Sequence, residues 1–164
     1  MEQEAILIGI SQLGAVFAGF IAMFMVFSQS NGQFTAVDAM RARVILFSSF
    51  AVVLAALLPV VLYGLSIPGV WAWRIAAALY LIAGILITVD VVRNQMALDK
   101  TVGTPRQIEI IRLLSRVLNL ALFLAGIAVF IGYRQGGVYV LMLLMNLTIA
   151  GLSFLSFAMH RLFR

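Results

Sequence analysis

The stretch from Val44 to Leu65 reads VILFSSFAVVLAALLPVVLYGL and contains no charged residue. An uncharged apolar run of about 18 residues or more is long enough to cross the hydrocarbon core of a bilayer as a helix. Inside that core each backbone N–H and C=O needs a partner within the chain, and a helix supplies it. We therefore predict a transmembrane helix over residues 44–65.

The same pattern recurs along the chain, with short turn sequences between the apolar runs. Breaker dipeptides and tripeptides follow the first, second and fourth runs at Asn31-Gly32, Pro68-Gly69 and Gln135-Gly136-Gly137. Thr104-Pro105-Arg106-Gln107 predicts a capped helix start before the fourth run enters the membrane. We predict an all-α membrane protein, a single domain over 1–164 formed by a bundle of five transmembrane helices. The predicted spans are about 5–27, 44–65, 70–92, 105–133 and 138–159.

The composition indicates that lipid surrounds much of the protein, and it excludes several kinds of functional site. The 164 residues are 64% hydrophobic and 10% charged, whereas a soluble domain has about 25% charged residues. There is no cysteine and one histidine, His160, which excludes thiolate sites and a multi-histidine metal site within one chain. Nucleophile-elbow, zinc-protease and nucleotide-binding motifs are missing. We expect no enzyme activity, no catalytic residues, no metal and no cofactor.

The basic residues predict the orientation. If the N-terminus is outside, nine of the 11 lysines and arginines fall on the cytoplasmic side, as the positive-inside rule requires. Aromatic residues typical of a headgroup-level belt fall at the opposite helix ends, and these are Tyr63, Trp71, Trp73, Tyr133 and Tyr139. We therefore place the C-terminus in the cytoplasm. The net charge of +5 is explained by attraction to anionic lipids of the inner leaflet, and no nucleic-acid partner is expected.

Asp90 is the only acidic residue inside a predicted span. An intramembrane carboxylate is a candidate for binding a cation or relaying a proton. Arg93 lies three residues later on the same helix face, so the alternative is an interfacial ion pair, with Arg112 or Arg116 as further partners.

Amides form the second group of candidates. Asn119, Asn146 and Gln12 lie inside predicted spans, where an amide either lines a polar path or joins two helices by a hydrogen bond. Small residues recur at spacing four in the first span, at Gly14, Ala18 and Ala22 and beside them at Ser11, Ala15 and Gly19. Such stripes permit close helix packing within one chain or between copies.

Two further residues have a structural and a functional interpretation. Arg74 follows Trp71 and Trp73 near the outer end of a span, where it either snorkels to the interface or binds an anion or lipid headgroup. Pro59 interrupts the hydrogen bonding of the second span, which marks either a kink for packing or a gate.

Four short motifs resemble those of small uncharacterised bacterial multi-pass inner-membrane proteins. They are Asp38-Ala-Met-Arg41, Leu57-Leu58-Pro59, Trp73-Arg74 and Arg161-Leu-Phe-Arg164. The resemblance covers most of the chain and implies a location in a bacterial inner membrane. It implies no activity.

Two functions remain open from the sequence. The first is an oligomeric channel or transporter for ions or small solutes, in which Asp90, Asn119, Asn146, Gln12 and Arg74 are the candidate polar residues. The alternative is a non-transporting accessory or scaffold subunit of a larger membrane complex. A homo-oligomer is expected for the first, because one chain has few helices and polar residues with which to enclose a path.

Overall fold

The computed structural model describes residues 3–30, 36–98 and 106–162. Within these ranges, the backbone alone is described for some residues, and these are 28–30, 36–38, 40–41, 90–92, 94–98, 106–112 and 156–162. Five long helices make up the described chain, and no strand occurs in it. The helices are α1 (Glu4–Ser30), α2 (Ala36–Gly64), α3 (Gly69–Leu98), α4 (Arg106–Ile131) and α5 (Gln135–Leu162).

Each helix contains a segment that is long and apolar enough to cross a membrane. These segments are Glu4–Phe27, Ala42–Gly64, Gly69–Val89, Leu113–Ile131 and Gln135–Leu155. The prediction of an all-helical protein with five apolar helices is confirmed. The helices extend past several predicted spans because a helix can continue beyond hydrocarbon into the headgroup region.

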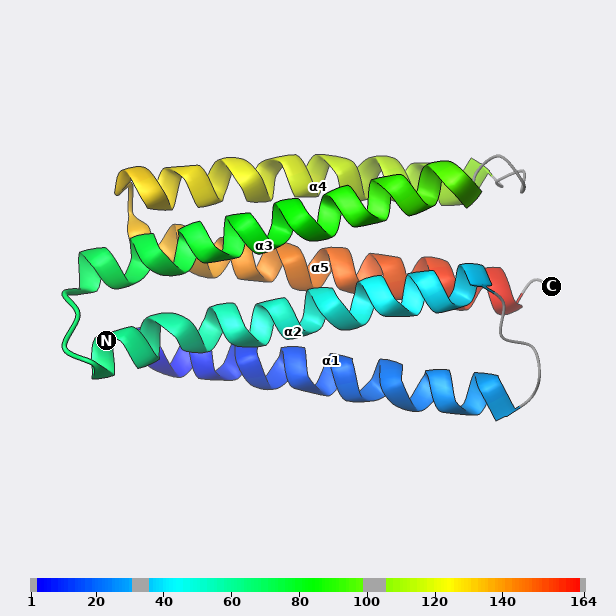
Figure 1. Cartoon of the computed structure of the whole chain (residues 1–164), viewed down its shortest axis with the longest axis horizontal. Helices are drawn as coiled ribbons and strands as arrows, with labels where there is room; N and C mark the ends of the chain where they lie inside the picture. Colours follow the sequence, from blue (N-terminus) through cyan, green and yellow to red (C-terminus); the bar gives the residue numbers. More distant parts are fainter. Residues whose placement is uncertain (1–2, 31–35, 99–105, 163–164) are drawn as a thin grey trace.

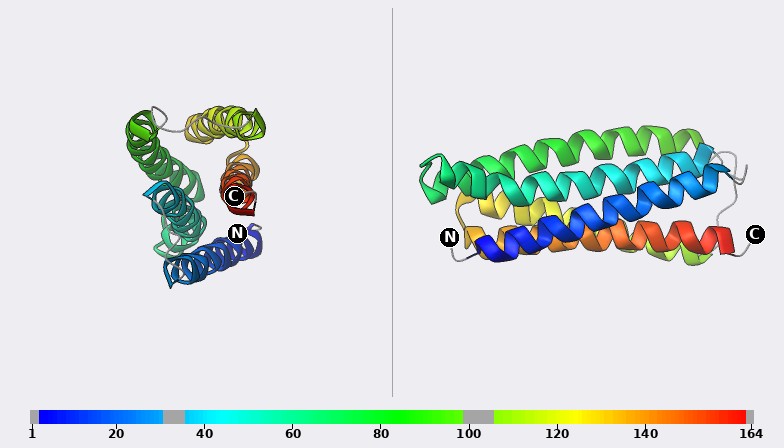
Figure 2. Two further views of the ribbon diagram at one scale, coloured as in Figure 1. Left: turned by 90° about the vertical axis from the view of Figure 1, so that its right-hand side faces the viewer. Right: turned by 90° about the horizontal axis from the view of Figure 1, so that it is seen from below.

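The helices run alternately up and down, so the start of α1 and the end of α5 lie at opposite ends of the bundle (Figure 1). Seen from one end, α2, α3, α4 and α5 surround a common centre, and α1 lies outside them (Figure 2). Contacts join each neighbouring pair around this ring, from α2 through α3 and α4 to α5 and back to α2. The helix α1 packs on α2 and α5.

Two helix ends are closed by the same backbone motif. At the end of α4, the Tyr133 N–H donates to the Ala128 carbonyl over 2.9 Å and the Gly132 N–H to the Val129 carbonyl over 3.0 Å. Gly132 has φ +104, so this is a Schellman cap that pairs the last carbonyls of the helix. The end of α2 has the equivalent bonds, with Ser66 at φ 62 in the glycine position.

The turn predicted at 135–137 is therefore misplaced. The chain turns at Gly132 and Arg134, where φ is positive, and Gln135 already begins α5. Glycines are tolerated in a first turn because its N–H groups have no intrahelical acceptor. A Cβ at Gly136 would overlap only the end of the flexible Gln3 side chain.

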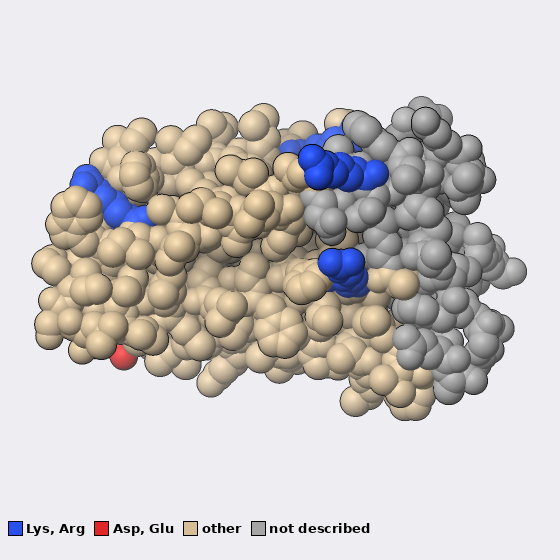
Figure 3. Space-filling model, viewed as in Figure 1, with Lys and Arg blue, Asp and Glu red and all other residues tan. Residues whose placement is uncertain are grey.

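The outer surface of the bundle is apolar over its middle. Val16, Leu54, Leu86 and Leu120 each expose about two-thirds of their side chain, as expected where lipid is the solvent. Among the described side chains, the charged ones gather toward the two ends and leave an uncharged band between them (Figure 3). Arg43, Arg93 and Arg116 lie toward one end, and Glu4, Arg74 and Arg134 toward the other.

The predicted aromatic belt is partly wrong. Tyr63, Trp71 and Tyr133 are exposed at helix ends, as a belt requires. Trp73 and Tyr139 are buried in the bundle instead, with their ring centroids 5.3 Å apart. An aromatic residue near a helix end can belong either to the headgroup belt or to the core. Which of the two it joins depends on whether that side of the helix faces lipid or the other helices.

Candidate functional site

A cavity of ≈ 410 Å³ lies among the four ring helices, and all four contribute to its wall. The contributions are Val44, Ser48 and Ala51 from α2; Tyr80, Gly84, Ile87 and Thr88 from α3; Arg116, Asn119, Leu120, Leu122 and Phe123 from α4; and Asn146 and Ile149 from α5. Most of these side chains are apolar. The volume falls in the range of small-molecule sites.

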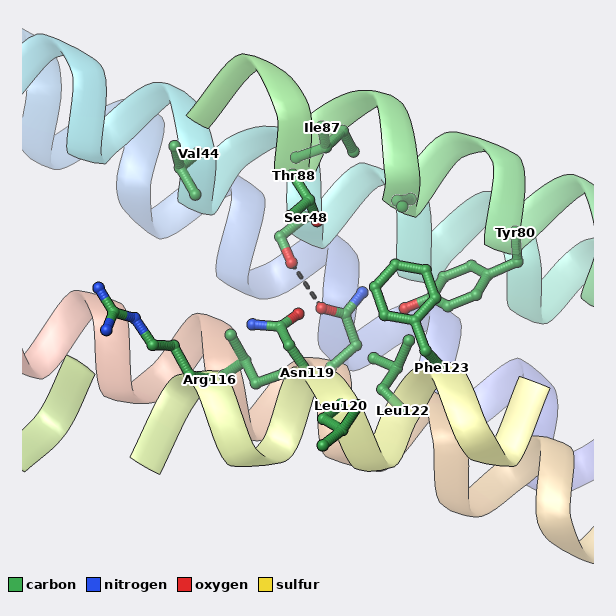
Figure 4. A pocket seen from close by; sticks show the side chains of 14 residues that line it. Val44, Ser48, Tyr80, Ile87, Thr88, Arg116, Asn119, Leu120, Leu122 and Phe123 are labelled. Carbon is green, nitrogen blue, oxygen red and sulfur yellow. Dashed lines mark hydrogen bonds between the residues drawn. The ribbon is translucent and has the colours of Figure 1, made fainter. Parts of the chain in front are cut away.

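The polar groups of the wall meet at Asn146. Its side-chain oxygen accepts a hydrogen bond of 2.7 Å from the Ser48 hydroxyl (Figure 4). Tyr80 of α3 is buried and lines the same wall. The Asn146 amide therefore joins α5 to α2. In an apolar surrounding this pairing matters, because an unpaired buried polar group is costly.

Asn119 faces the same cavity from α4. Its amide donates 2.9 Å to the backbone carbonyl of Ser115, one turn earlier on its own helix. That bond uses one of two amide hydrogens and leaves the side-chain oxygen available. The two asparagines that the sequence singled out thus line one cavity within a single chain, together with Ser48, Tyr80 and Thr88.

The cavity is closed on one side by a packed layer. Tyr139, Met142, Leu143, Ala76 and Val129 are fully buried in the half of the bundle away from Arg116. The Tyr139 hydroxyl donates 2.7 Å to the Ala55 carbonyl of α2. Pro59 lies four residues after Ala55 and has no N–H, so this carbonyl has lost its helical donor. The tyrosine supplies the missing partner, and α2 continues through Pro59 to Gly64.

Arg74 lies in that closed half, remote from the cavity. Its guanidinium group reaches the Ile131 carbonyl at 3.5 Å and lies over the Trp71 ring, 5.4 Å from the centroid. Gln135 reaches the Val70 carbonyl at 3.4 Å across the same junction. These contacts join the start of α3 to the end of α4 and the start of α5. They favour the interfacial interpretation of Arg74, and an anion site there stays a prediction.

Gln12 and Asp90 are not joined to the asparagines by any described contact. Gln12 is exposed on α1, which contributes nothing to the cavity wall. Asp90 belongs to α3, two residues beyond Thr88, but its side chain lies outside the described residues. Its roles as an ion-pair partner or a transport residue both stay predictions. Thr104 and Pro105, the predicted cap, also lie outside the described residues, and α4 begins at Arg106.

Sequence reasoning missed three polar wall residues, namely Ser48, Tyr80 and Thr88, although each is a polar residue within an apolar span. Arg116 was considered only as an ion-pair partner of Asp90, and it lies on the cavity wall. Within the described part of the chain, no group of three or more histidine or acidic side chains could hold a metal ion.

Comparison with known proteins gives no relative: no protein-family model, no curated protein and no solved structure matches this chain.

Proposed function

We propose that this chain is a membrane transporter for small organic solutes, and that the cavity among α2, α3, α4 and α5 is its solute site. The observation that carries the proposal is the position of two intramembrane asparagines, Asn119 and Asn146, on the wall of one cavity. Amides buried in a membrane domain are expected to face the interior or a polar path. Here both face a space large enough for a ligand.

The shape of the site favours a carrier over an open pore. The cavity occupies the half of the bundle that bears Arg116, and the packed layer around Tyr139 closes the other half. Alternating access needs a site near mid-membrane that is open to one side at a time. The mostly apolar wall also favours organic solutes over bare ions, because a bare ion needs several oxygen ligands in place of its water.

Filling the cavity is the direct test. A Cβ added at Gly84 would meet only the Phe123 ring, at 3.7 and 3.9 Å, which is ordinary contact. Gly84→Phe therefore accommodates its Cβ without a clash, adds a ring on the cavity side and removes a helix-weakening glycine. We expect it to reduce solute uptake into proteoliposomes at least about tenfold, which corresponds to about 1.4 kcal/mol. The probes are radiolabelled decanesulfonate and decyltrimethylammonium, both permanently charged.

Gly19→Phe is the matched control. Gly19 is also a helical glycine, it is exposed on α1, and nothing lies within 4 Å of its added Cβ. This variant should transport like the wild-type chain. The proposal fails if neither probe enters faster than into protein-free liposomes, or if Gly84→Phe and Gly19→Phe transport equally well.

The accessory-subunit function has one observation in its favour. On α1, Gln12 is exposed together with Ala15, Gly19 and Ala22, on the face turned away from the bundle. An exposed amide at membrane depth is costly without a partner. A second protein or a second copy on this face would supply one. A stable complex with a different protein, combined with absence of uptake in the liposome assay, would favour this alternative.

A homo-oligomer and a bacterial inner membrane remain parts of the proposal. The mass of the detergent-solubilised protein tests the first of them.

A further inference from the structure

The cavity wall changes in character from one end to the other. Arg116 lies at one end of the lining side chains, and the rings of Tyr80 and Phe123 lie at the other (Figure 4). Asn119 and Ser48 stand between them. The ligand that matches this wall has a polar head at the arginine end and an apolar body toward the rings, because each part then meets groups of its own kind.

The head should carry a negative charge. Arg116 is the one charged residue among the described side chains of the wall, and its predicted partner Asp90 lies outside the described side chains. A guanidinium group is well suited to carboxylate, phosphate and sulfonate oxygens.

The dimensions favour a ligand with a single short chain. Arg116 and Phe123 line the wall seven residues apart on α4, which corresponds to about 10 Å along a helix axis. An extended chain of about ten carbons has a similar length, and the cavity volume of ≈ 410 Å³ is that of a small-molecule site.

We propose that the solute of this cavity is a single-chain amphipathic anion of about ten carbons. Its head binds at Arg116 beside Asn119, and its chain extends toward Tyr80 and Phe123. This inference rests on the proposed function, since it names the solute class for the same site. The shared head chemistry is an oxyanion, of which a fatty acid and an alkyl phosphate are two sources.

Equilibrium binding in lipid nanodiscs tests the charge preference. Decanesulfonate, decanol and decyltrimethylammonium have one chain length and differ in the sign of the head, and protein-free nanodiscs give the background for each. We expect decanesulfonate to bind the wild-type chain about tenfold more tightly than decanol, and decyltrimethylammonium to bind most weakly. Decanoate and decyl phosphate, added as competitors, distinguish a fatty acid from a phosphate ester as the better ligand.

Arg116→Gln should remove the tenfold preference for decanesulfonate over decanol, whereas Arg116→Lys should keep most of the preference. Arg43→Gln is the matched control, because Arg43 is an exposed arginine at the same end that lies over the Phe47 ring, 5.3 Å from the centroid, and is no part of the wall. It should behave as wild type.

Two results separate this inference from the proposed function. If Gly84→Phe abolishes binding of all three probes but Arg116→Gln leaves their order unchanged, the cavity is a solute site and the anionic head is wrong. If Gly84→Phe changes no binding and no uptake, the proposed function itself is wrong. A decanesulfonate preference lost equally in Arg43→Gln and Arg116→Gln would also overturn the inference, because it would reflect general surface charge.

Discussion

Replacing Gly14 by leucine is expected to destabilise the bundle more than the same change at any exposed glycine. A Cβ at Gly14 would lie 2.9 Å from Val53 Cγ2 and 3.2 Å from the Ser49 backbone carbonyl oxygen. The carbonyl belongs to the backbone of α2 and cannot rotate away, so α1 has to move. Overpacking of this kind costs about 1–3 kcal/mol, and leucine adds three further carbons beyond the Cβ.

Thermal unfolding in a mild detergent measures the effect. Gly14→Leu should melt well below wild type, whereas Gly19→Leu should melt at or above it, because Gly19 has open space around its Cβ and leucine favours the helix. Equal melting temperatures for the two variants would show that α1 does not pack on α2 through Gly14.

The second large effect is expected at Tyr139. Removing its hydroxyl in Tyr139→Phe leaves the Ala55 carbonyl without a donor, since Pro59 cannot supply one. The ring still fills its buried place against Trp73. An unpaired buried acceptor costs about 1–3 kcal/mol, so we expect a loss of that size in the free energy of unfolding.

A double-mutant cycle with Pro59→Ala isolates the cause. Alanine at position 59 restores an N–H for the Ala55 carbonyl, so Tyr139→Phe should cost much less in that background than in the wild-type background. The measurement is the free energy of unfolding of the four proteins in the same detergent. Additive effects of the two substitutions would mean that the hydroxyl and the proline act independently.

The five helices could be predicted from the sequence because their signal is local. Each apolar run, such as 44–65, is long enough for a bilayer and contains too few charges for a soluble domain. The ends were less predictable. Gly136 and Gly137 resemble a turn in sequence, yet the Schellman cap at Gly132 ends α4 earlier and places both glycines inside α5.

The direction in which each residue faces could not be predicted in the same way. A soluble helix has one polar side, but a membrane helix is apolar toward lipid and toward the core. The two small-residue stripes of α1 illustrate this, because each has both buried and exposed members. Gly14, Ala18 and Ser11 are buried, whereas Ala22, Ala15 and Gly19 are exposed. Trp73 and Tyr139 were assigned to the surface for the same reason, and both are buried.

The candidate site was partly predictable. Asn119 and Asn146 were identified because an amide in an apolar run is conspicuous, and they do line one cavity. The presence of Ser48 and Tyr80 beside Asn146 could not be predicted. It depends on how α2 and α3 pack against α5, and no fixed spacing in the sequence indicates that packing. Gln12 has the same local signal as the asparagines, but α1 lies outside the ring of helices, so its amide faces away.

The central claim is that the bundle holds a water-accessible cavity open at the end that bears Arg116. The chain has no native cysteine, so single cysteines can be introduced at Asn119, on the cavity wall, and at Leu124, exposed on the outer surface of the same helix. A membrane-impermeant thiol reagent is then applied to either side of oriented vesicles. If the end that bears Arg116 is cytoplasmic, as the positive-inside rule predicts, Asn119→Cys should react from the cytoplasmic side only. Leu124→Cys should react from neither side, because a thiol reacts as the thiolate and lipid does not ionise it. Equal protection of both cysteines, or reaction of Asn119→Cys from the outer side, would contradict the central claim.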